Sequence, residues 1–482
     1  MQPAARVPVF DAIKALAFVG DLSMGQPVDH SARTAWIASR LAAAIGRDAT
    51  AQGHAACVAL LRWSGCTANA PEFSDLLGDD VGGRRAMLAT ASARDAAEFA
   101  NSVGPLAEIH CEVSGEIARV LGMPDEVERP LRHIFESYDG QGKPAGLSAA
   151  QIPEAVFLVA IAGDLEIFSR VHGLHSALRH IAERADARYP AALVEAVESH
   201  AVDWLHALEQ GAAADLQPPS RALKDATAPL ELIADVIDLK LPWMTGFSRR
   251  VAEAAAACAQ RMGLDTPVRE QVRRAALIHG IGRASVPNAV WDSPKARSEA
   301  DRERLRLVPY WTERAARRIE ALQAEAEIAS FVDERLDGSG FFRGAKGAAI
   351  GTAERVLAAA AQWVLLQTGG PGRPALADGD AIAQLQREAE QGRLDVAAVA
   401  ALTGRERSAA PASPADEAGA LLSAREIEVL GRISLGESNK EAARSLGISP
   451  STVRAHLENI FRKLGCTTRA AATLRALTLG ML

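Results

Sequence analysis

The chain has 482 residues, 48% of them hydrophobic, and a formal net charge of −7. This length predicts about three domains on the usual range of roughly 100 to 200 residues each, and the apolar content is ample for packed cores. No apolar run approaches the length of a membrane span, so we exclude a membrane-spanning protein and expect a soluble one.

The N-terminal segment has a short apolar patch that Asp11 and Lys14 interrupt. Phe10, Ile13 and Ala17 stand at helical spacing, so we expect an amphipathic helix there rather than a signal peptide.

Five cysteines are scattered along the chain, and none of them has the Cys-x-x-Cys spacing of many metal sites. Their odd number and spacing argue against a disulfide framework and against a structural zinc site. We expect reduced thiols and a cytoplasmic location. The cysteines are Cys57, Cys66, Cys111, Cys258 and Cys466.

Two stretches, 209–230 and 404–420, are rich in Ala, Pro, Ser and charged residues and lack an apolar period. They predict linkers that divide the chain into regions 1–208, 231–403 and 421–482. Almost all other segments have helical periodicity, so we expect a nearly all-helical, all-α protein.

The first two regions resemble each other internally. VALLRWSG at 58–65 aligns with AALIHGIG at 275–282 with an offset of 217, and ESYDGQGKPAGL at 136–147 aligns with ERLDGSGFFRGA at 334–345 with an offset of 198. The change of offset places about 19 extra residues in the first copy, after Gly65. We therefore predict two tandem copies of one helical domain.

The second copy resembles the HD-GYP branch of the HD phosphohydrolases through LIHGIGRASVPNAVWDSP, ERLDGSGFFRGAKGAAI and AERVLAAAAQWVLL, which follow the order of that family. The resemblance implies a helical fold. In that family, His and Asp ligands hold two or three metal ions that hydrolyse phosphodiesters such as cyclic di-GMP.

Most of the ligand positions implied by this resemblance lack a metal ligand. In the second copy only His279 remains as a familiar ligand, and in the first copy His30 and His110 remain. Asp164 and His133 stand one residue out of register, and such a slip rotates a helical side chain by about 100°. In chain order, the positions hold Phe247, His279, Gly280, Val308, Val332, Asp333 and Ala361 in the second copy. In the first copy they hold His30, Arg62, Trp63, His110, Ile134, Phe135 and Gly163.

Neither set retains more than two donors, whereas a catalytic metal site ordinarily needs three protein ligands and an open position. We therefore expect no catalytic residue, no metal and no cofactor, and we interpret His30, His110 and His279 as hydrogen-bonded core histidines. We also expect the two copies to pack against each other and to bury Trp63 and Phe247, whose aromatic groups fill former ligand positions. A further group, His172, His175 and His180, is a weaker metal candidate and is typical of a helix face near a loop.

The turns Asp139–Gly142 and Asp337–Gly340 stay intact although the ligands are lost. Such turns shape loops and carry no chemistry. A fold kept without its metals predicts a sensor or interaction module, by analogy of fold alone.

The last region carries strong helix punctuation. Ser423 and Ser438 begin capping boxes with Glu426 and Glu441, and Ser449 precedes a proline at a first helical position. Glycines follow each segment, so we predict helices near 424–435, 439–446 and 450–464, and a last one near 468–479. A short turn joins the second to the third, as in a helix-turn-helix.

This region contains nine Lys and Arg against five Glu and no Asp, so it carries about +4 while the rest of the chain carries about −11. A basic module on an acidic body indicates a polyanionic partner. The predicted third helix has an apolar stripe of Val453, Leu457, Ile460, Phe461 and Leu464. Its opposite face holds Ser451, Arg454, Ala455, Glu458 and Arg462.

The region resembles the DNA-binding domain of LuxR-type (NarL/FixJ) regulators, with LSAREIEVL, GESNKEAARSLGISPSTVRAHLENIFRKLG and TTRAAA matching without a gap. The resemblance implies that Arg454, Ala455 and Glu458 face base edges. It places Thr452 and Val453 at the beginning of the reading helix and among the DNA-binding residues. It also implies that Lys440, His456 and Lys463 approach phosphates. Glu458 departs from the lysine often found there, and a carboxylate accepts from cytosine N4.

We therefore expect two tandem degenerate HD-like domains followed by a four-helix LuxR-type domain, in a homodimeric transcriptional regulator that binds double-stranded DNA. A small molecule or nucleotide is a candidate effector. One alternative is a metal-dependent HD-type phosphodiesterase, in which the remaining histidines recruit substitute ligands. Another is a sensor that binds a cyclic dinucleotide without cleaving it.

Overall fold

The computed structural model describes residues 5–90, 93–218, 220–404 and 421–482. Regular structure in this part of the chain is almost entirely helical, and the short strands β1 (Arg6–Pro8) and β2 (Thr227–Pro229) pair with each other. The prediction of an all-α fold is confirmed. Within the described residues, the helices lack the length and apolar content needed to cross a membrane.

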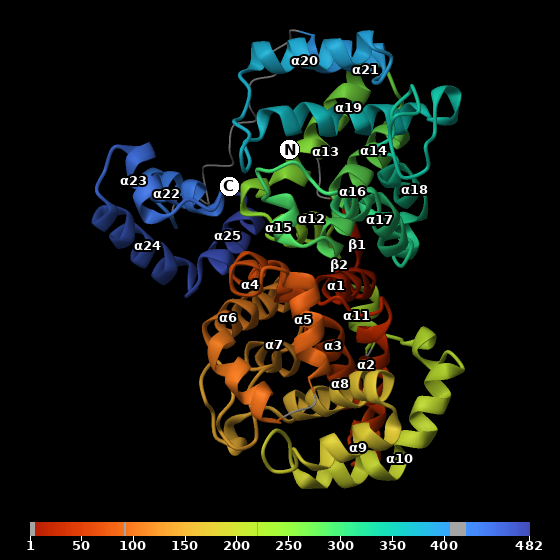
Figure 1. The fold of residues 1–482 in the computed structure, drawn as a ribbon, viewed down its shortest axis with the longest axis vertical. Coiled ribbons are helices and arrows are strands. Elements are labelled where there is room, and N and C mark those ends of the chain that lie inside the picture. The colour runs from red at the N-terminus through yellow and green to blue at the C-terminus, as the bar shows by residue number, and fades with distance from the viewer. Residues whose placement is uncertain (1–4, 91–92, 219, 405–420) are drawn as a thin grey trace. The chain divides into compact units, whose positions relative to one another are not determined.

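The chain forms two compact units, and Figure 1 shows their helices in chain order by colour. We call Pro8–Ala228 the N-terminal unit and Pro229–Leu482, with the described residues before Pro8, the second unit. The division falls inside the expected linker 209–230, which nevertheless carries regular structure such as β2. Apart from Gly404, the expected linker 404–420 lies outside the described residues.

The N-terminal unit consists of helices wrapped around a largely buried first helix, α1. Its helices are α1 (Val9–Ser23), α2 (His30–Ala44), α3 (Ala49–Leu61), α4 (Ala70–Leu77), α5 (Asp80–Ala89), α6 (Ala93–Val120), α7 (Asp125–Arg132), α8 (Glu154–His172), α9 (Leu174–Ala182), α10 (Ala191–Glu209) and α11 (Arg221–Asp225).

The predicted N-terminal helix is present, but it is not amphipathic. All residues of α1 except Lys14 are buried, because α2, α3 and α5 pack around it. A helix that is buried on every side needs no polar face. Asp11 is accommodated in this surrounding by an ion pair of 2.7 Å with Lys14.

The second unit contains the second HD-like copy and the C-terminal region. Within it, α19 and α20 lie side by side (Figure 1). Its helices are α12 (Glu231–Asp238), α13 (Phe247–Arg261), α14 (Thr266–Ile278), α15 (Asn288–Trp291), α16 (Glu299–Arg306), α17 (Val308–Ala316), α18 (Gln323–Ser330), α19 (Thr352–Gln367), α20 (Asp378–Glu390), α21 (Val396–Thr403), α22 (Ala424–Ser434), α23 (Asn439–Leu446), α24 (Pro450–Leu464) and α25 (Arg469–Thr478).

The internal repeat is visible in equivalent hydrogen bonds at the start of each copy. In the N-terminal unit the Asp21 carboxylate accepts from the backbone N–H of Ser31 at 3.1 Å and from its hydroxyl at 2.6 Å. In the second unit the Asp238 carboxylate accepts from the N–H of Ser248 at 2.7 Å and from its hydroxyl at 2.8 Å. Both pairs join the first helix of a copy to the N-terminus of the second.

The later part of the repeat is fixed by two buried glutamates. The Glu136 carboxylate accepts backbone N–H bonds of 2.7 and 2.9 Å from residues nine and eleven positions later. Glu334 accepts from the same relative positions at 2.6 and 2.9 Å. Each glutamate thus closes the loop that begins with the Asp-Gly-x-Gly turn, which explains why these loops are alike although the ligands differ.

A glycine permits a close helix approach in each copy. The N–H of Gly65 donates to Ser114 Oγ at 3.0 Å, and the N–H of Gly282 donates to Thr312 Oγ1 at 3.0 Å. A Cβ atom would lie 2.3 Å from a carbonyl oxygen at Gly65 and 2.0 Å from one at Gly282. Only glycine fits at either position. The 19 extra residues follow Gly65, in the stretch that forms α4, α5 and the beginning of α6.

The C-terminal helices begin where the sequence places them. Ser423 and Ser438 form complete capping boxes with Glu426 and Glu441, and Ser449 caps α24 through the N–H of Thr452. The C-caps Gly447 and Gly465 of α23 and α24 adopt the left-handed conformation, which L side chains rarely adopt. Local signals therefore define this domain almost completely.

Candidate functional site

The three remnant histidines are buried, and each makes a hydrogen bond through its ring. His30 is 0% exposed, His110 1% and His279 2%. Burial lowers the pKa of each imidazole, in His110 and in His279 to about 3. These rings are therefore neutral at physiological pH, as expected for core histidines.

In the N-terminal unit, a guanidinium group faces the ring nitrogen of His30 that could otherwise bind a metal. Arg62 Nη2 lies 2.9 Å from His30 Nε2, and Glu166 Oε2 lies 2.5 Å from His30 Nδ1. A neutral ring satisfies both contacts when Nδ1–H donates to Glu166 and Nε2 accepts from Arg62. His30 thus has no lone pair left for a metal ion.

The missing late aspartate makes room for this arginine. Gly163 stands at that position, and a Cβ atom there would lie 1.9 Å from Arg62 Nη1. Arg62 Nη1 instead donates to the carbonyl of Val159 at 3.2 Å. Burial lowers the pKa of Arg62 to about 10, opposed by Asp164 and other nearby carboxylates, so the group remains a cation at neutral pH.

The second unit contains the same kind of pair, built from different positions. Arg283 Nη2 lies 2.8 Å from His279 Nε2, and His279 Nδ1 donates to the carbonyl of Ala276 at 2.5 Å. Arg283 Nη1 also lies 3.2 Å from a carboxylate oxygen of Asp238 and its guanidinium stacks over the Phe247 ring. Arg283 follows His279 by four residues, whereas Arg62 occupies the first copy's equivalent of His279.

A glycine again stands where a carboxylate is missing. A Cβ atom at Gly280 would lie 2.6 Å from Arg283 Nη1. In both copies, therefore, a lost carboxylate position lies against the guanidinium of a buried arginine. Among the described residues, no three His, Cys, Asp or Glu side chains come together to hold a metal ion. These residues do not fit the metal centre of an HD phosphohydrolase.

His110 does not join His30 in one cluster around the guanidinium. Its Nε2 lies 2.6 Å from the backbone carbonyl of Arg62, and its Nδ1 lies 3.6 Å from Cys66 Sγ. The ring packs beside Trp63 and Phe135. His110 therefore belongs to an apolar cluster.

Both aromatic residues at former ligand positions are buried, which confirms this part of the expectation; the packing of the two copies against each other stays a prediction. Trp63 is 6% exposed and Phe247 is 2% exposed. The weaker histidine group lies on two neighbouring helices near the surface, where the ring centroids of His172 and His180 are 5.8 Å apart. His172 lies 2.9 Å from the carbonyl of Ala89 through Nε2, and His180 pairs with Glu183.

Sequence reasoning missed Arg283 and Glu166 and treated Arg62 only as an absent ligand. A signal was present, because a lost carboxylate position in each copy holds glycine, which leaves space. A single sequence does not say which side chain fills such a space. Arg283 lies outside every expected ligand position, so only its folded position reveals the contact.

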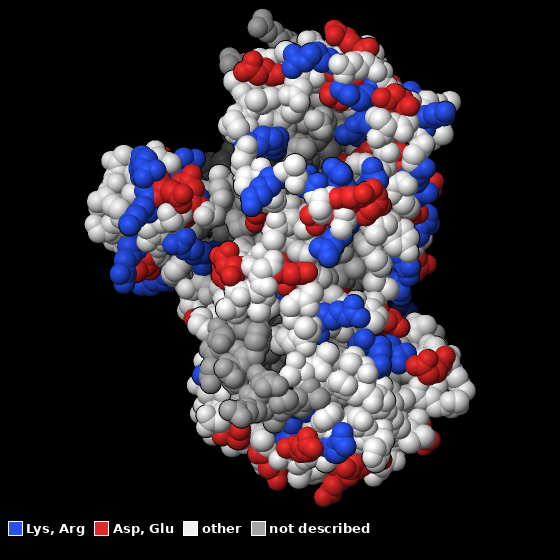
Figure 2. All heavy atoms as spheres, viewed as in Figure 1, with Lys and Arg blue, Asp and Glu red and all other residues white. Residues whose placement is uncertain are grey.

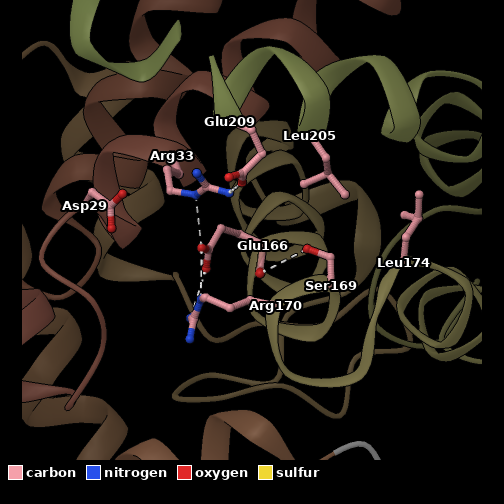
Figure 3. Close-up of a pocket in the computed structure, with 8 residues that line it drawn as sticks. All are labelled: Asp29, Arg33, Glu166, Ser169, Arg170, Leu174, Leu205 and Glu209. Carbon is pink, nitrogen blue, oxygen red and sulfur yellow. Dashed lines mark hydrogen bonds and ion pairs between the residues drawn. The ribbon is translucent and has the colours of Figure 1, made fainter. Parts of the chain in front are cut away.

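A cavity of about 420 Å³ opens beside Glu166 in the N-terminal unit (Figure 3). Arg33 and Arg170 approach the Glu166 carboxylate from opposite sides, at 3.3 and 3.2 Å. Burial opposes ionisation of Glu166, but His30 and Arg170 outweigh it and lower its pKa to about 2. The cavity lining consists of Asp29, Arg33, Glu166, Ser169, Arg170, Leu174, Leu205 and Glu209.

The other candidate site is the outer face of α24. Arg454, Ala455 and Glu458 are exposed, as is Thr452, and His456 is half-buried. Figure 2 shows Lys and Arg side chains gathered along the edge of the domain that α24 forms. The remaining members of the predicted outer face, Ser451 and Arg462, are exposed as well.

Two of the implied DNA-binding residues make contacts within the domain. Val453 is 0% exposed and packs in the core of the domain with the rest of the apolar stripe, so its inclusion among DNA-contacting side chains is corrected. Lys463 Nζ lies 2.7 Å from Glu426 Oε2, so a phosphate would have to compete with this ion pair. Lys440 is exposed at the start of α23.

Comparison with protein families matches residues 231–398 to the HD domain and residues 420–476 to the bacterial regulatory proteins of the luxR family. The chain contains an HD domain and a C-terminal LuxR-type domain. The HD domain match covers the second copy.

A relative that matches most of the chain is the 3'3'-cGAMP-specific phosphodiesterase 3 of Vibrio cholerae, which is 25% identical over 422 residues. The match covers 79% of this chain and 90% of that protein. The C-terminal domain is similar to the HTH-type transcriptional activator RamA of Corynebacterium glutamicum, with 46% identity over 61 residues. That match covers 13% of this chain and 22% of RamA.

A solved structure also resembles the chain. The crystal structure of a cyclic GMP-AMP-specific phosphodiesterase of V. cholerae matches with a TM-score of 0.59 and 22% identity. The match covers 83% of this chain and 97% of the chain in that structure. At this identity the match establishes a common fold.

Replacing Arg283 by Met should lower the stability of the protein by about 3 kcal/mol or more, because Asp238 would stay buried without its cation and His279 Nε2 without its donor. Arg306→Met removes a guanidinium from an exposed ion pair with Glu303 and should change stability by less than about 0.5 kcal/mol. Urea unfolding of both variants measures the difference. Equal stability of the two variants would contradict a structural role for Arg283.

The neutral state of His279 predicts a pH dependence. Burial lowers its pKa to about 3, so between pH 6.5 and pH 3 the unfolded chain binds a proton that the folded chain does not. Its contribution to stability is therefore complete above pH 6.5 and is lost as the pH falls through this window. His279→Gln should lower the slope of unfolding free energy against pH by up to about 1.4 kcal/mol per unit. Parallel profiles for the two proteins would contradict this.

Proposed function

We propose that this chain is a transcriptional regulator that binds double-stranded DNA through α24 and that its HD-like copies sense or bind a partner without hydrolysis. The exposed polar face of α24 carries the proposal. Its basic and hydrogen-bonding groups project from a helix that caps and apolar packing hold rigid, as a major-groove helix requires. The LuxR-type match over the same residues supports this role.

The absence of hydrolysis is proposed from the two arginine–histidine pairs. Hydrolysis in this fold would need metal ions that activate water and hold phosphate oxygens. At both pairs, a permanent cation already faces the imidazole nitrogen that would bind a metal. Repulsion between this cation and a metal ion adds to the loss of carboxylate ligands.

The comparisons favour a cyclic dinucleotide as effector, because the relative that matches most of the chain is specific for 3'3'-cGAMP. A non-cleaving sensor is therefore the second candidate role of the HD-like region. The cavity beside Glu166 holds three carboxylates and two guanidinium groups, so a dianionic nucleotide fits it poorly. An interaction module that binds a protein partner is the remaining alternative.

We further propose that the regulator acts as a homodimer on an inverted repeat. Two-fold symmetry requires two recognition helices about 34 Å apart, which places both half-sites on one face of the duplex.

Two substitutions should separate base recognition from phosphate binding. Arg454→Ala should cost roughly 1 to 3 kcal/mol per half-site and relax sequence preference. Lys440→Ala should weaken binding to all sequences alike and lower the salt slope by about one unit per subunit, because it removes a phosphate contact. Fluorescence anisotropy on selected and scrambled duplexes at several salt concentrations measures both effects. Unchanged discrimination by Arg454→Ala would show that α24 is not the reading helix.

Purified protein should contain no stoichiometric transition metal and should leave 3'3'-cGAMP and cyclic di-GMP intact, because the buried arginines replace the ligands. Metal analysis and chromatography of the reaction mixture test this. One or more ions per chain, or turnover in the presence of Mn²⁺, would support the phosphodiesterase alternative. Calorimetric titration with 3'3'-cGAMP then separates a nucleotide sensor from a protein-interaction module.

A further inference from the structure

Arg454 and Glu458 form an ion pair on the outer face of α24. Arg454 Nε donates to Glu458 Oε1 at 3.1 Å, and the two side chains are 77% and 67% exposed. They stand four residues apart, so they lie on one face of the helix, one turn from each other.

Stability of the helix does not explain this pair. Exposed ion pairs contribute little to stability, and the order with the cation nearer the N-terminus is the weaker of the two. The pair also places a carboxylate on a face that is otherwise suited to DNA, where it repels phosphates. The Glu458 carboxylate lowers the affinity for DNA of any sequence, and a role in base recognition accounts for its presence.

The ion pair leaves a defined set of hydrogen-bonding groups exposed. It uses Nε of Arg454, and among the described residues neither Nη atom of Arg454 has a hydrogen-bond partner. The two Nη atoms form the end of a planar guanidinium and donate in parallel. Glu458 Oε2 is likewise without a donor within the described part of the chain. Together, these groups offer two donors and one acceptor.

The major-groove edge of a G·C pair presents the complementary pattern. Guanine N7 and O6 are acceptors and cytosine N4 is a donor, whereas an A·T pair presents an acceptor, a donor and an acceptor. We propose that Arg454 and Glu458 read one G·C pair together in each half-site, Arg454 binding guanine N7 and O6 and Glu458 accepting from cytosine N4. An A·T pair would oppose a donor to Arg454 and an acceptor to Glu458.

The inference rests on the proposed DNA-binding function and adds a division of labour within it. Glu458 acts in two ways, since it holds the Arg454 guanidinium through Nε and contributes its own base contact. Removing Glu458 should therefore raise affinity for DNA in general but lower discrimination. This combination differs from that of a merely structural residue, whose loss would lower both.

The experiment is selection of binding sites from a pool of randomised DNA duplexes by the full-length protein, followed by titration of the enriched site. The wild type should enrich a G·C pair at one fixed position of each half-site. Arg454→Ala and Glu458→Ala should each reduce discrimination at that position roughly 10-fold or more against an A·T substitution. The double variant should lose less than the sum of the two single losses, because each residue also holds the other in place.

A matched control and a conservative variant complete the test. Glu428→Ala removes the carboxylate of a similar ion pair, with Arg425 at 2.6 Å on α22, and should leave base preference unchanged. Glu458→Gln keeps an acceptor and should retain more of the preference for G·C than Glu458→Ala. Both Arg454 and Glu458 are exposed, so their variants should unfold at the temperature of the wild type.

The outcomes separate the inference from the function on which it rests. If the protein binds no duplex above background, the proposed function itself fails. If the protein selects a site but Arg454→Ala and Glu458→Ala affect different positions, or their effects add, the shared reading of one G·C pair is wrong and the DNA-binding function stands.

Discussion

The contact between a buried guanidinium and a neutral imidazole is the constraint on which both HD-like copies depend. Arg62 and Arg283 are cations in low-dielectric surroundings, and each is kept there by a histidine nitrogen and nearby carboxylates. A buried cation without such partners would be strongly destabilising. The neighbouring residues follow from this requirement: Gly163 and Gly280 leave room for the side chains, and Asp238 balances charge.

The buried arginine comes from a different position of the repeat in each copy. The scaffold of Asp21 and Asp238, and of Glu136 and Glu334, is the same in both, whereas the arginine comes from different places. What the copies share is therefore a rigid helical framework with a filled centre. The LuxR-type domain follows this repeat at residues 420–476.

The sequence predicts the C-terminal domain well because its signals are local. Caps such as Ser423 and Ser449 and the apolar stripe of α24 each involve residues within a few turns of one another. For the HD-like copies, the sequence predicts the helical framework but not the contacts of the buried arginines. The contacts of Arg62 with His30 and of Arg283 with Asp238 join residues 32 and 45 positions apart, and no local pattern encodes them. Val453 is buried because it belongs to the apolar stripe of α24, although the family resemblance implies a role in DNA binding.

The Nε2 atoms of His30 and His279 accept from arginine and are therefore unavailable to metal ions. Nitrogen-15 spectra of histidine-labelled protein, recorded with and without added Zn²⁺, test it most directly. We expect neutral rings protonated at Nδ1 in both residues, with Nε2 signals that Zn²⁺ leaves unchanged. A Zn²⁺-dependent shift of either Nε2 signal, or a ring protonated at Nε2, would contradict it.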